Sequence, residues 1–191
     1  MVPVRIGGDG GREVVKLAAA AGRGITLSLD GSARLELVDN SVSFADVPDS
    51  HWAADAIDFV SSRGLFLGGD GGFQPGAGMS RAMLFTVLAR LEGVDVSGGT
   101  PWYSPAVDWV QKAGVSDGSA PESLITREQL AVMLYRFVGP EAAAADLTGF
   151  SDYGDISDWS LDAMCWAVSE GILTGSPDGR LFPSSPASRA E

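Results

Sequence analysis

The stretch Leu124-Ile125-Thr126-Arg127-Glu128-Gln129, which precedes an apolar run, decides how this chain is expected to fold. Related elements occur at Met79-Ser80-Arg81-Ala82-Met83 and at Ala187-Ser188-Arg189-Ala190-Glu191. Each element places a hydroxyl residue, a typical helix N-cap, directly before an arginine. After Thr126 and after Ser188, a residue three positions on (Gln129 and Glu191) completes the spacing of a capping box. The pattern therefore predicts the start of a helix at each element.

An arginine at the first position of a helix is locally unfavourable, because the helix dipole is positive at that end. Arg81, Arg127 and Arg189 all occupy this position. We therefore expect at least one of them to bind an anion, which free backbone N–H groups at a helix start would also favour. The alternative is structural: each arginine pairs with a nearby acid, such as Asp46 or Asp152, and holds a loop in place.

Composition narrows the classes of function. The 191 residues allow one or two domains, and the hydrophobic fraction of 45% is that of an ordinary globular protein. The net charge of −12 disfavours nucleic acid, whose binding requires a basic face, and disfavours a polybasic membrane contact. The single cysteine, Cys165, excludes an internal disulfide and a cysteine-rich zinc site. Neither a cofactor nor a metal ion is predicted.

The two ends of the sequence suggest a longer precursor. No apolar run approaches the roughly 20 residues of a membrane-spanning helix, so no membrane insertion is expected. The first residues lack the basic start and apolar core of a secretory signal. The third arginine element ends the sequence before a helix can follow it. We interpret both ends as cuts.

The first 43 residues differ from the remainder and favour short strands. Segments 25–29 and 33–37 alternate apolar and polar residues around the turn Asp30-Gly31-Ser32, which predicts a β-hairpin. Segments 4–6 and 14–17, separated by a glycine-rich stretch, predict a second and weaker pair. We expect residues 1–43 to form the tail of an upstream β-domain or a small cap on the part that follows.

From Phe44 onward the sequence repeats itself three times. A tryptophan, a short apolar stripe at helical spacing and a glycine recur in each copy. Each glycine stands where a left-handed residue ends a helix. The matching positions are Trp52, Ala56, Phe59 and Gly64; Trp102, Ala106, Trp109 and Gly114; and Trp159, Ala163, Trp166 and Gly171.

The hydroxyl-arginine element follows in each copy and begins a second, longer helix in the first two. Neither longer helix can bury its apolar stripe alone, so the repeats are expected to pack on one another. The copies span about 44–92, 100–139 and 150–191, and the third is truncated before its long helix. The second copy lacks a Phe-x-Asp opening and a Phe-x-Pro, and its loop before the arginine is shorter.

These repeats resemble the S-layer homology (SLH) family over roughly residues 44–191. In the first copy the resemblance rests on Phe44-Ala45-Asp46-Val47, Phe73-x-Pro75 and Ser80-Arg81-Ala82. In the third copy it rests on Phe150-Ser151-Asp152, on Gly171-Ile172-Leu173-Thr174-Gly175 and on Ser188-Arg189-Ala190-Glu191. The last of these is close to the Thr-Arg-Ala-Glu signature of the family.

The resemblance implies a mainly α fold, with three helix–loop–helix repeats around a pseudo-threefold helical bundle, preceded here by the short β segment. Such modules attach exported bacterial proteins to secondary cell-wall polysaccharides, often ones with pyruvate ketals. The family's grooves lie between neighbouring repeats, and the signature arginine is a principal contact. Tryptophans are candidate groove walls, with core packing as their alternative. The candidate ligand-binding residues are Arg81, Arg127, Arg189, Trp52, Trp102, Trp159, Asp46, Asp152, Ser80 and Thr126.

We therefore predict a non-catalytic anchoring module at the cell wall or surface of a bacterium. Its expected partner is an anionic secondary cell-wall polysaccharide, whose carboxylate can meet a guanidinium through two parallel hydrogen bonds. Two alternatives are a structural S-layer or surface scaffold segment that self-associates, and the anchoring tail of a larger glycoside hydrolase. Glycoside hydrolysis needs two carboxylates facing each other across a cleft, and no such pair is indicated by the sequence.

Overall fold

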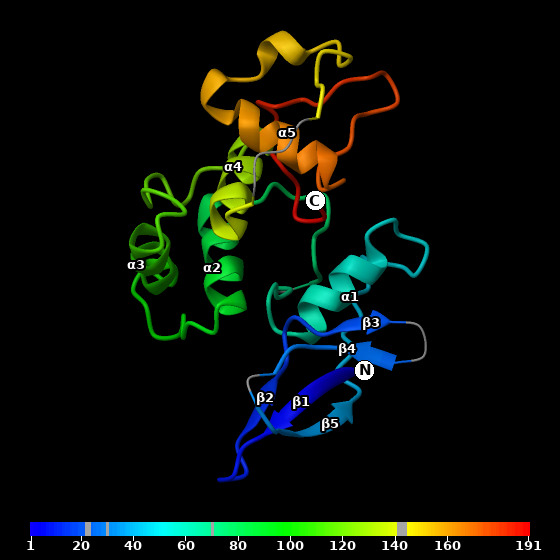
Figure 1. Ribbon diagram of the computed structural model, residues 1–191, viewed down its shortest axis with the longest axis vertical. Coiled ribbons are helices and arrows are strands. Elements are labelled where there is room, and N and C mark those ends of the chain that lie inside the picture. Colours follow the sequence, from blue (N-terminus) through cyan, green and yellow to red (C-terminus); the bar gives the residue numbers. More distant parts are fainter. Residues whose placement is uncertain (22–23, 30, 70, 141–144) are drawn as a thin grey trace. The chain divides into compact units, whose positions relative to one another are not determined.

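The computed structural model describes residues 1–21, 24–29, 31–69, 71–140 and 145–191 (Figure 1). It divides into two compact units. The first unit comprises residues 1–76, 90–93 and 190, and the second comprises residues 77–89, 94–189 and 191. The described residues form five α-helices, two short 3-10 helices and two small sheets, a mixed content in which helix predominates.

The first unit begins with a three-stranded sheet in the order β2-β1-β5. Its strands are β1 (Val2–Ile6), β2 (Arg12–Val14) and β5 (Arg34–Val38), and both neighbours run antiparallel to β1. Val4 of β1 lies opposite Val14 of β2, so segment 4–6 pairs as predicted, but its partner strand is 12–14 and overlaps the predicted segment 14–17 only at Val14. A separate antiparallel pair joins β3 (Ala19–Ala21) to β4 (Gly24–Thr26).

The hairpin predicted between segments 25–29 and 33–37 is wrong. The first segment contributes to β4, which pairs with β3, whereas the second contains most of β5, which pairs with β1. The physical reason is that β1 carries the buried side chains Val2 and Val4, and pairing on both edges satisfies its backbone groups. A local hairpin would have left one edge of β1 without a partner. Asp30 of the predicted turn lies outside the described residues.

Residues 44–76 of the first repeat belong to the same unit as this sheet. Helix α1 (Ala54–Ser62) buries Ile57 in a small core with Ala53 and Phe73. The Phe44 ring lies 5.4 Å from the Phe73 ring and closes this core. A Cβ at Gly68 would stand 2.3 Å from the Phe44 ring, which explains why a glycine ends the loop after α1. The short apolar helix and its small core follow directly from the repeat pattern.

The second unit contains α3 (Ser104–Lys112), α4 (Arg127–Val138), α5 (Leu161–Ser169) and most of α2 (Arg81–Leu91). Two 3-10 helices, η1 (Tyr153–Asp155) and η2 (Asp158–Ser160), precede α5. Helices α4 and α5 pack side by side around a core that includes Met164 and Ala167 (Figure 1). The short helices and the two longer ones therefore form where the repeat pattern places them, while the pseudo-threefold bundle stays a prediction.

The predicted glycine stands two residues after the last residue of each short helix. Gly64, Gly114 and Gly171 have φ angles of 64°, 70° and 69°, respectively. A residue with a side chain would be strained in this left-handed conformation, because its Cβ approaches the backbone. The glycine that closes each helix is therefore confirmed as a left-handed C-terminal residue in all three copies.

A closed ring of backbone hydrogen bonds joins the three hydroxyl-arginine elements in the second unit. The Met79 N–H donates to the Ala187 carbonyl, the Ala187 N–H to the Ile125 carbonyl, and the Ile125 N–H to the Met79 carbonyl. Each of these bonds is 2.9 Å long. The three side chains are at most 5% exposed. The elements that the sequence suggested as a repeated motif thus contact one another directly.

Candidate functional site

The first N–H groups of α2 and α4 are not free, so the expectation that they would favour an anion is wrong. The Arg81 and Ala82 N–H groups donate to the carbonyls of Ser123 and Pro121, at 3.0 and 2.8 Å. The ring brings the loop of the next copy against each helix start, and its carbonyls satisfy donors that an isolated helix leaves unpaired. The same two bonds at α4 run from Arg127 to Ser185 and from Glu128 to Pro183.

Each copy has a proline in the loop before its arginine, although the Phe-x-Pro pattern did not identify the one in the second copy. Pro75, Pro121 and Pro183 each precede an arginine by six positions (75 to 81, 121 to 127, 183 to 189). Each follows a non-glycine residue with positive φ: Gln74 at 59°, Ala120 at 45° and Phe182 at 51°. The second copy therefore ends its loop like the others despite lacking a Phe-x-Pro. The constant proline-to-arginine spacing is the signal that could have identified it.

The Arg81 side chain is held by the loop of the second copy. Its Nε donates to the Ser119 carbonyl at 2.9 Å, and its Nη2 donates to Ser116 Oγ at 3.1 Å. The same Nη2 lies 3.3 Å from Asp117 Oδ1. The Arg81 side chain is 12% exposed, whereas that of Asp117 is 74% exposed. One edge of the guanidinium is therefore fixed by the loop, and its acidic partner is open to solvent.

Arg81 lines a cleft of about 380 Å³ in the second unit. One wall is a face of α4, because the α4 residues in the lining recur at three- and four-residue spacing. The lining contains two cationic side chains, Arg81 and Arg136, and one acidic side chain, Asp117. The sequence analysis did not single out Arg136, since one arginine in an apolar helix has no distinguishing pattern. The cleft is lined by Arg81, Ser116, Asp117, Gln129, Val132, Met133, Arg136 and Trp159.

Arg127 is placed in the same way against the third copy. Its Nε donates to the Leu181 carbonyl at 2.8 Å, and its Nη2 donates to the Thr174 carbonyl at 3.2 Å. Its Nη1 forms an ion pair with Glu191. Burial lowers the pKa of the Arg127 guanidinium, and the charge of the Asp152 carboxylate opposes that shift. Arg127 remains a cation, and an acid of this chain already pairs with it.

The hydroxyl residues before the arginines are helix caps. Thr126 Oγ1 accepts a hydrogen bond from the Gln129 N–H, and the Gln129 side chain accepts one from the Thr126 N–H, which confirms the predicted capping box. Ser80 Oγ accepts from the Met83 N–H at 3.3 Å. Their capping role accounts for the Ser80 and Thr126 side chains, and their contact with a ligand stays a prediction. The third arginine, Arg189, contacts Met83 Sδ through Nη1 at 3.5 Å.

The two candidate aspartates hold loops through backbone amides. Asp152 accepts hydrogen bonds from the Leu181 and Phe182 N–H groups, at 2.9 and 2.7 Å. Asp46 accepts from the Phe73 and Gln74 N–H groups at 2.9 and 2.6 Å, at the corresponding place in the first copy. Both carboxylates thus fix the residue with positive φ that precedes the loop proline. Their role as hydrogen-bond partners of a ligand stays a prediction.

Loss of the Asp152 carboxylate should destabilise the protein in a pH-dependent way. Burial alone would raise the pKa of Asp152, but hydrogen bonds from the Leu181 and Phe182 amides outweigh it, so the pKa lies below its ordinary value. The carboxylate therefore stabilises the fold above about pH 5 and loses this effect as pH falls below about 4. We expect Asp152→Ala to lose about 2–3 kcal/mol at pH 7, because two amides lose their acceptor.

Urea unfolding at pH 7, 5 and 3 checks this expectation. The stability difference between Asp152→Ala and the unsubstituted chain should be constant from pH 7 to 5 and shrink at pH 3. Asp9→Ala is a matched control, because Asp9 is an exposed acid whose amide partner, Gly11, lies in an exposed turn. A difference that does not change with pH would contradict the proposed role of the ionised carboxylate.

The three helix-start tryptophans are exposed, so the alternative that they pack in the core is wrong. Trp52, Trp102 and Trp159 are 72%, 53% and 57% exposed. Trp159 lines the Arg81 cleft. Trp52 stacks on His51 with ring centroids 5.8 Å apart, and Trp102 meets the Tyr103 ring edge-on at 5.4 Å. The structure therefore brings one predicted tryptophan together with one predicted arginine.

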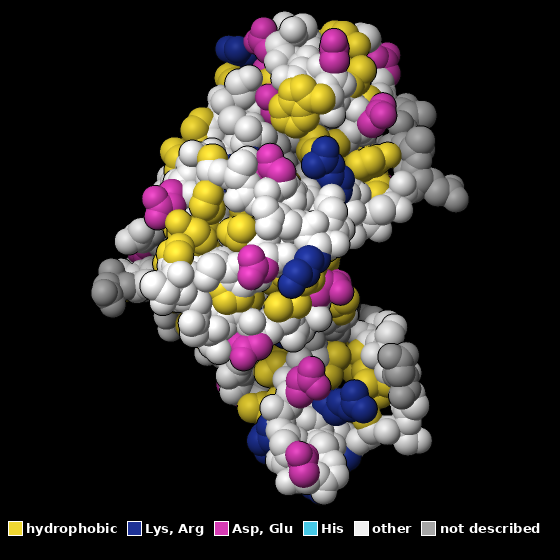
Figure 2. Space-filling model, turned by 90° about the vertical axis from the view of Figure 1, so that its left-hand side faces the viewer, with side chains coloured by type: hydrophobic (Ala, Val, Ile, Leu, Met, Phe, Trp, Pro, Cys, Tyr) yellow, Lys and Arg dark blue, Asp and Glu magenta, His cyan; other side chains and the backbone are white. Residues whose placement is uncertain are grey.

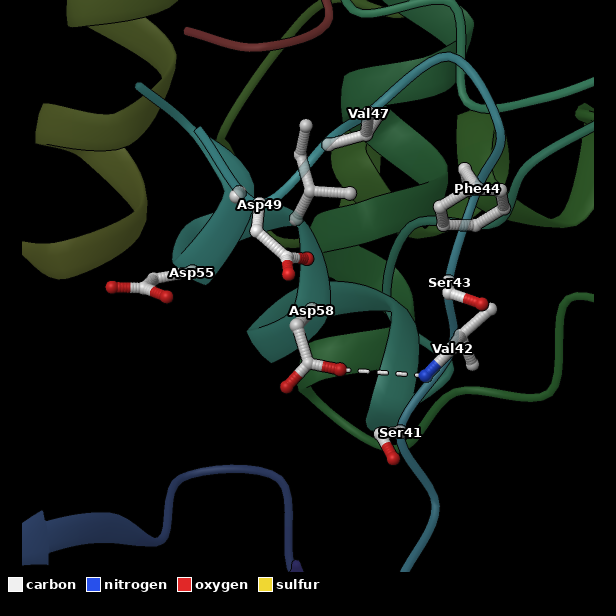
Figure 3. Close-up of a pocket in the computed structure, with 10 residues that line it drawn as sticks. Ser41, Val42, Ser43, Phe44, Val47, Asp49, Asp55 and Asp58 are labelled. Carbon is white, nitrogen blue, oxygen red and sulfur yellow. Dashed lines mark hydrogen bonds between the residues drawn. The ribbon is translucent and has the colours of Figure 1, made fainter. Parts of the chain in front are cut away.

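A second pocket, of about 360 Å³, lies in the first unit and has the opposite charge (Figure 3). The Asp49, Asp55 and Asp58 carboxylates line it, and Asp58 Oδ1 accepts a hydrogen bond from the Val42 N–H at 3.3 Å. Three acids without a basic side chain in the lining disfavour an anionic ligand. Within the described part of the chain, no group of three or more His, Cys, Asp or Glu residues could hold a metal ion.

The surface charge of the protein is mainly negative. Figure 2 shows a face on which Asp and Glu side chains are widely spread while Lys and Arg side chains occur singly. The cleft that holds both Arg81 and Arg136 therefore differs from the surrounding surface. Among the residues that the structure describes, no helix is long and apolar enough to span a membrane.

Comparison with known proteins identifies the repeats. The model of the S-layer homology domain family matches residues 43–82 and 149–191. The chain is 29% identical to the exoglucanase XynX of Acetivibrio thermocellus over 81% of the chain and 16% of that enzyme. It is 28% identical to an amylopullulanase of Thermoanaerobacterium thermosulfurigenes, over 92% of the chain and 10% of that enzyme.

A third relative is an S-layer protein of Bacillus thuringiensis subsp. finitimus, 27% identical over 78% of the chain and 20% of that protein. The chain thus spans between a tenth and a fifth of the length of these relatives. The S-layer homology segments and the S-layer relatives indicate a location at the cell surface or cell wall of a bacterium. Residues 43–82 and 149–191 are thus matched as S-layer homology domains, and the S-layer relatives support this assignment.

Proposed function

We propose that this chain is a non-catalytic anchoring module that holds an exported protein on an anionic secondary cell-wall polysaccharide. Arg81 makes the principal contact, in the cleft that it shares with Trp159. Residues 44–191 form the anchoring module, with residues 1–43 as a short β segment attached to it. The long helices gather about a pseudo-threefold axis, so that grooves of the same kind recur between neighbouring repeats.

The Arg81 cleft is the observation that carries this proposal. The Ser119 carbonyl fixes Nε of Arg81, so the guanidinium is preorganised while its terminal nitrogens face the loop at Ser116 and Asp117. Asp117 is largely exposed, and an exposed ion pair of this kind contributes little, so a ligand carboxylate can compete with it. A pyruvate ketal on a sugar supplies such a carboxylate, and a guanidinium binds it through two parallel hydrogen bonds.

The remaining lining residues suit a sugar with a negative substituent. The exposed Trp159 indole can cover the apolar face of a sugar ring while its N–H donates to a hydroxyl group. Arg136 adds a second positive charge from α4. The net charge of −12 slows non-specific capture of other polyanions, so that affinity depends on the cleft.

Several kinds of full-length protein are compatible with this role. The relatives include an exoglucanase and an amylopullulanase as well as S-layer proteins, and the chain matches only a small part of each. An anchoring module serves an enzyme and a surface-layer protein equally well, because both must be retained at the cell wall. The alternatives, a structural S-layer segment or the tail of a glycoside hydrolase, thus differ in what the rest of the protein does.

Binding to purified cell-wall sacculi tests the proposed function. We expect native sacculi to pull the chain down from solution, whereas sacculi stripped of their polysaccharide with hydrofluoric acid should leave it in the supernatant. Because the interaction is ionic, retention should also fall as salt is raised. Equal retention on native and stripped sacculi would show that the polysaccharide is not the partner.

A further inference from the structure

Arg136 occupies a repeated position whose counterpart in the first copy has a structural role. It stands ten residues after Thr126, as Arg90 stands ten residues after Ser80 (126 to 136, 80 to 90). In the first copy, Arg90 Nη1 donates to the Leu65 carbonyl at 3.1 Å, in the loop after α1. Burial lowers the pKa of the Arg90 guanidinium. Arg90 therefore ties its helix to the loop of its own repeat.

Arg136 lacks this attachment and lies open in the cleft. In the second copy, Val115 takes the place of Leu65, directly after the glycine that follows the short helix. No hydrogen bond or ion pair joins the Arg136 guanidinium to Val115, or to any other residue that the structure describes. Arg136 is exposed and lines the same cleft as Arg81 and Trp159. The second copy thus places in a cleft the cation that the first copy uses within its fold.

The charges of the cleft are balanced except at Arg136. Arg81 Nη2 lies 3.3 Å from Asp117 Oδ1, so these two side chains form an ion pair. Apart from this pair and Arg136, the lining side chains are uncharged. Two cations and one acid leave one positive charge in excess, and Arg136 supplies it.

We propose that Arg136 makes the cleft select a sugar with a single negative charge over the uncharged form of the same sugar. One carboxylate on the ligand balances the excess charge of the lining. Arg81, which already pairs with Asp117, supplies hydrogen bonds whose direction the Ser119 carbonyl fixes. Arg136 is thus a specificity-determining residue beside the principal contact. The proposal rests on the proposed function, since it names the class of ligand that the same cleft takes.

Helix α4 positions Arg136 for this role. Arg136 follows Val132 and Met133 at four- and three-residue spacing, so it shares the helix face that forms one wall of the cleft. It also lies in the last turn of α4, where the helix dipole is negative and favours a cation. A cation in this place needs no acid of the chain to hold it. Its charge therefore stays available for a ligand.

Calorimetric titration with two matched sugars tests this selection. The first is methyl 4,6-O-(1-carboxyethylidene)-β-D-glucopyranoside, a pyruvylated monosaccharide, and the second is its carboxamide, which has the same shape without the charge. We expect Arg136→Gln to lower affinity for the acid about five- to tenfold at low salt, because one charge-charge attraction is lost. Affinity for the amide should stay within about twofold. An unchanged ratio of the two affinities would overturn the proposal.

Two further variants separate the charge of Arg136 from its packing. Arg136→Lys keeps a cation on α4 and should keep most of the preference for the acid, whereas a role of the planar guanidinium in packing would be lost. Lys112→Gln removes an exposed cation at the end of α3, in the same unit but outside the cleft lining, and should leave the preference unchanged. Equal loss of preference in Lys112→Gln and Arg136→Gln would show that the net charge of the protein selects the ligand.

Iodide quenching of Trp159 fluorescence separates failure of this proposal from failure of the proposed function. In a chain with Trp52→Phe and Trp102→Phe, Trp159 is the most exposed of the remaining tryptophans. The charge of Arg136 should concentrate iodide at the indole, so Arg136→Gln should lower the iodide quenching constant about twofold. Quenching by neutral acrylamide should not change. If neither sugar binds while iodide quenching falls as expected, the proposed function fails and the charge assignment stands. Equal iodide quenching with and without Arg136 would refute the assignment.

Discussion

Arg81→Ala should remove most of the retention of this chain on native sacculi. The substitution deletes the cation of the cleft, and a hydrogen bond to a charged group contributes about 1.5–3 kcal/mol, or roughly 10- to 150-fold in affinity. The Trp159 indole and Arg136 stay in the cleft and retain a weak interaction. The measurement is the bound fraction as a function of sacculus concentration at fixed salt. Binding within about twofold of the unsubstituted chain would reject Arg81 as the principal contact.

Two controls separate the charge of Arg81 from its position. Arg12→Ala removes a cation that pairs with Glu36 on the surface of the sheet, so the net charge changes equally and binding should not change. Arg81→Lys keeps the charge but loses the planar fork that binds a carboxylate in two places, so it should restore binding only in part. Thermal unfolding of each variant should also be measured, because Arg81 Nε donates a hydrogen bond to the Ser119 carbonyl and its loss affects the fold.

Glu128→Ala should be strongly destabilising and should also weaken binding. Glu128 is 6% exposed at the start of α4, and its carboxylate accepts hydrogen bonds from the Ser157 N–H and from the Ser157 and Ser160 hydroxyls. Ser157 directly precedes η2 and Ser160 is its last residue, so these bonds hold the short helix that contains Trp159. Loss of three bonds to a buried carboxylate is expected to cost about 3 kcal/mol, which lowers the Tm by about 6–12 °C in a protein of this size.

The effect on binding follows from the position of Trp159. Without the Glu128 carboxylate, η2 loses its attachment to α4, and the indole no longer has a fixed place in the Arg81 cleft. Thermal unfolding measures the first effect, and sacculus binding below the Tm measures the second. Glu128→Gln keeps one acceptor oxygen on the side chain, so it should recover part of the Tm and part of the binding. A variant with a lowered Tm and unchanged binding would show that Glu128 stabilises the fold without positioning Trp159.

The helices and their boundaries could be predicted because their causes are local. A hydroxyl residue before an arginine, a stripe at helical spacing and a glycine with left-handed geometry each act within one or two turns. Gly64, Gly114 and Gly171 therefore have the expected conformation, and Thr126 forms the expected capping box. The S-layer homology family was likewise recognisable, because its motifs recur at constant spacing along the chain.

The pairing of strands could not be predicted in the same way. The segment around β5 has an adjacent partner in sequence, but it pairs with β1 instead. Alternation of apolar and polar residues along a strand indicates which side chains share a face of the sheet. It does not indicate which other strand forms the backbone hydrogen bonds. That choice depended on β1, which carries buried valines and pairs along both edges.

The sequence by itself determined the repeat, the helix starts, the acidic surface and the set of arginines from which a binding residue would be chosen. Only the tertiary structure decided what surrounds each arginine. Arg81 shares a cleft with Trp159 and Arg136, whereas Arg127 pairs with Glu191. The physical reason is that a ring of backbone bonds between Met79, Ile125 and Ala187 brings together residues far apart in the chain. Charge depends on those neighbours, so identical motifs acquire different electrostatic surroundings.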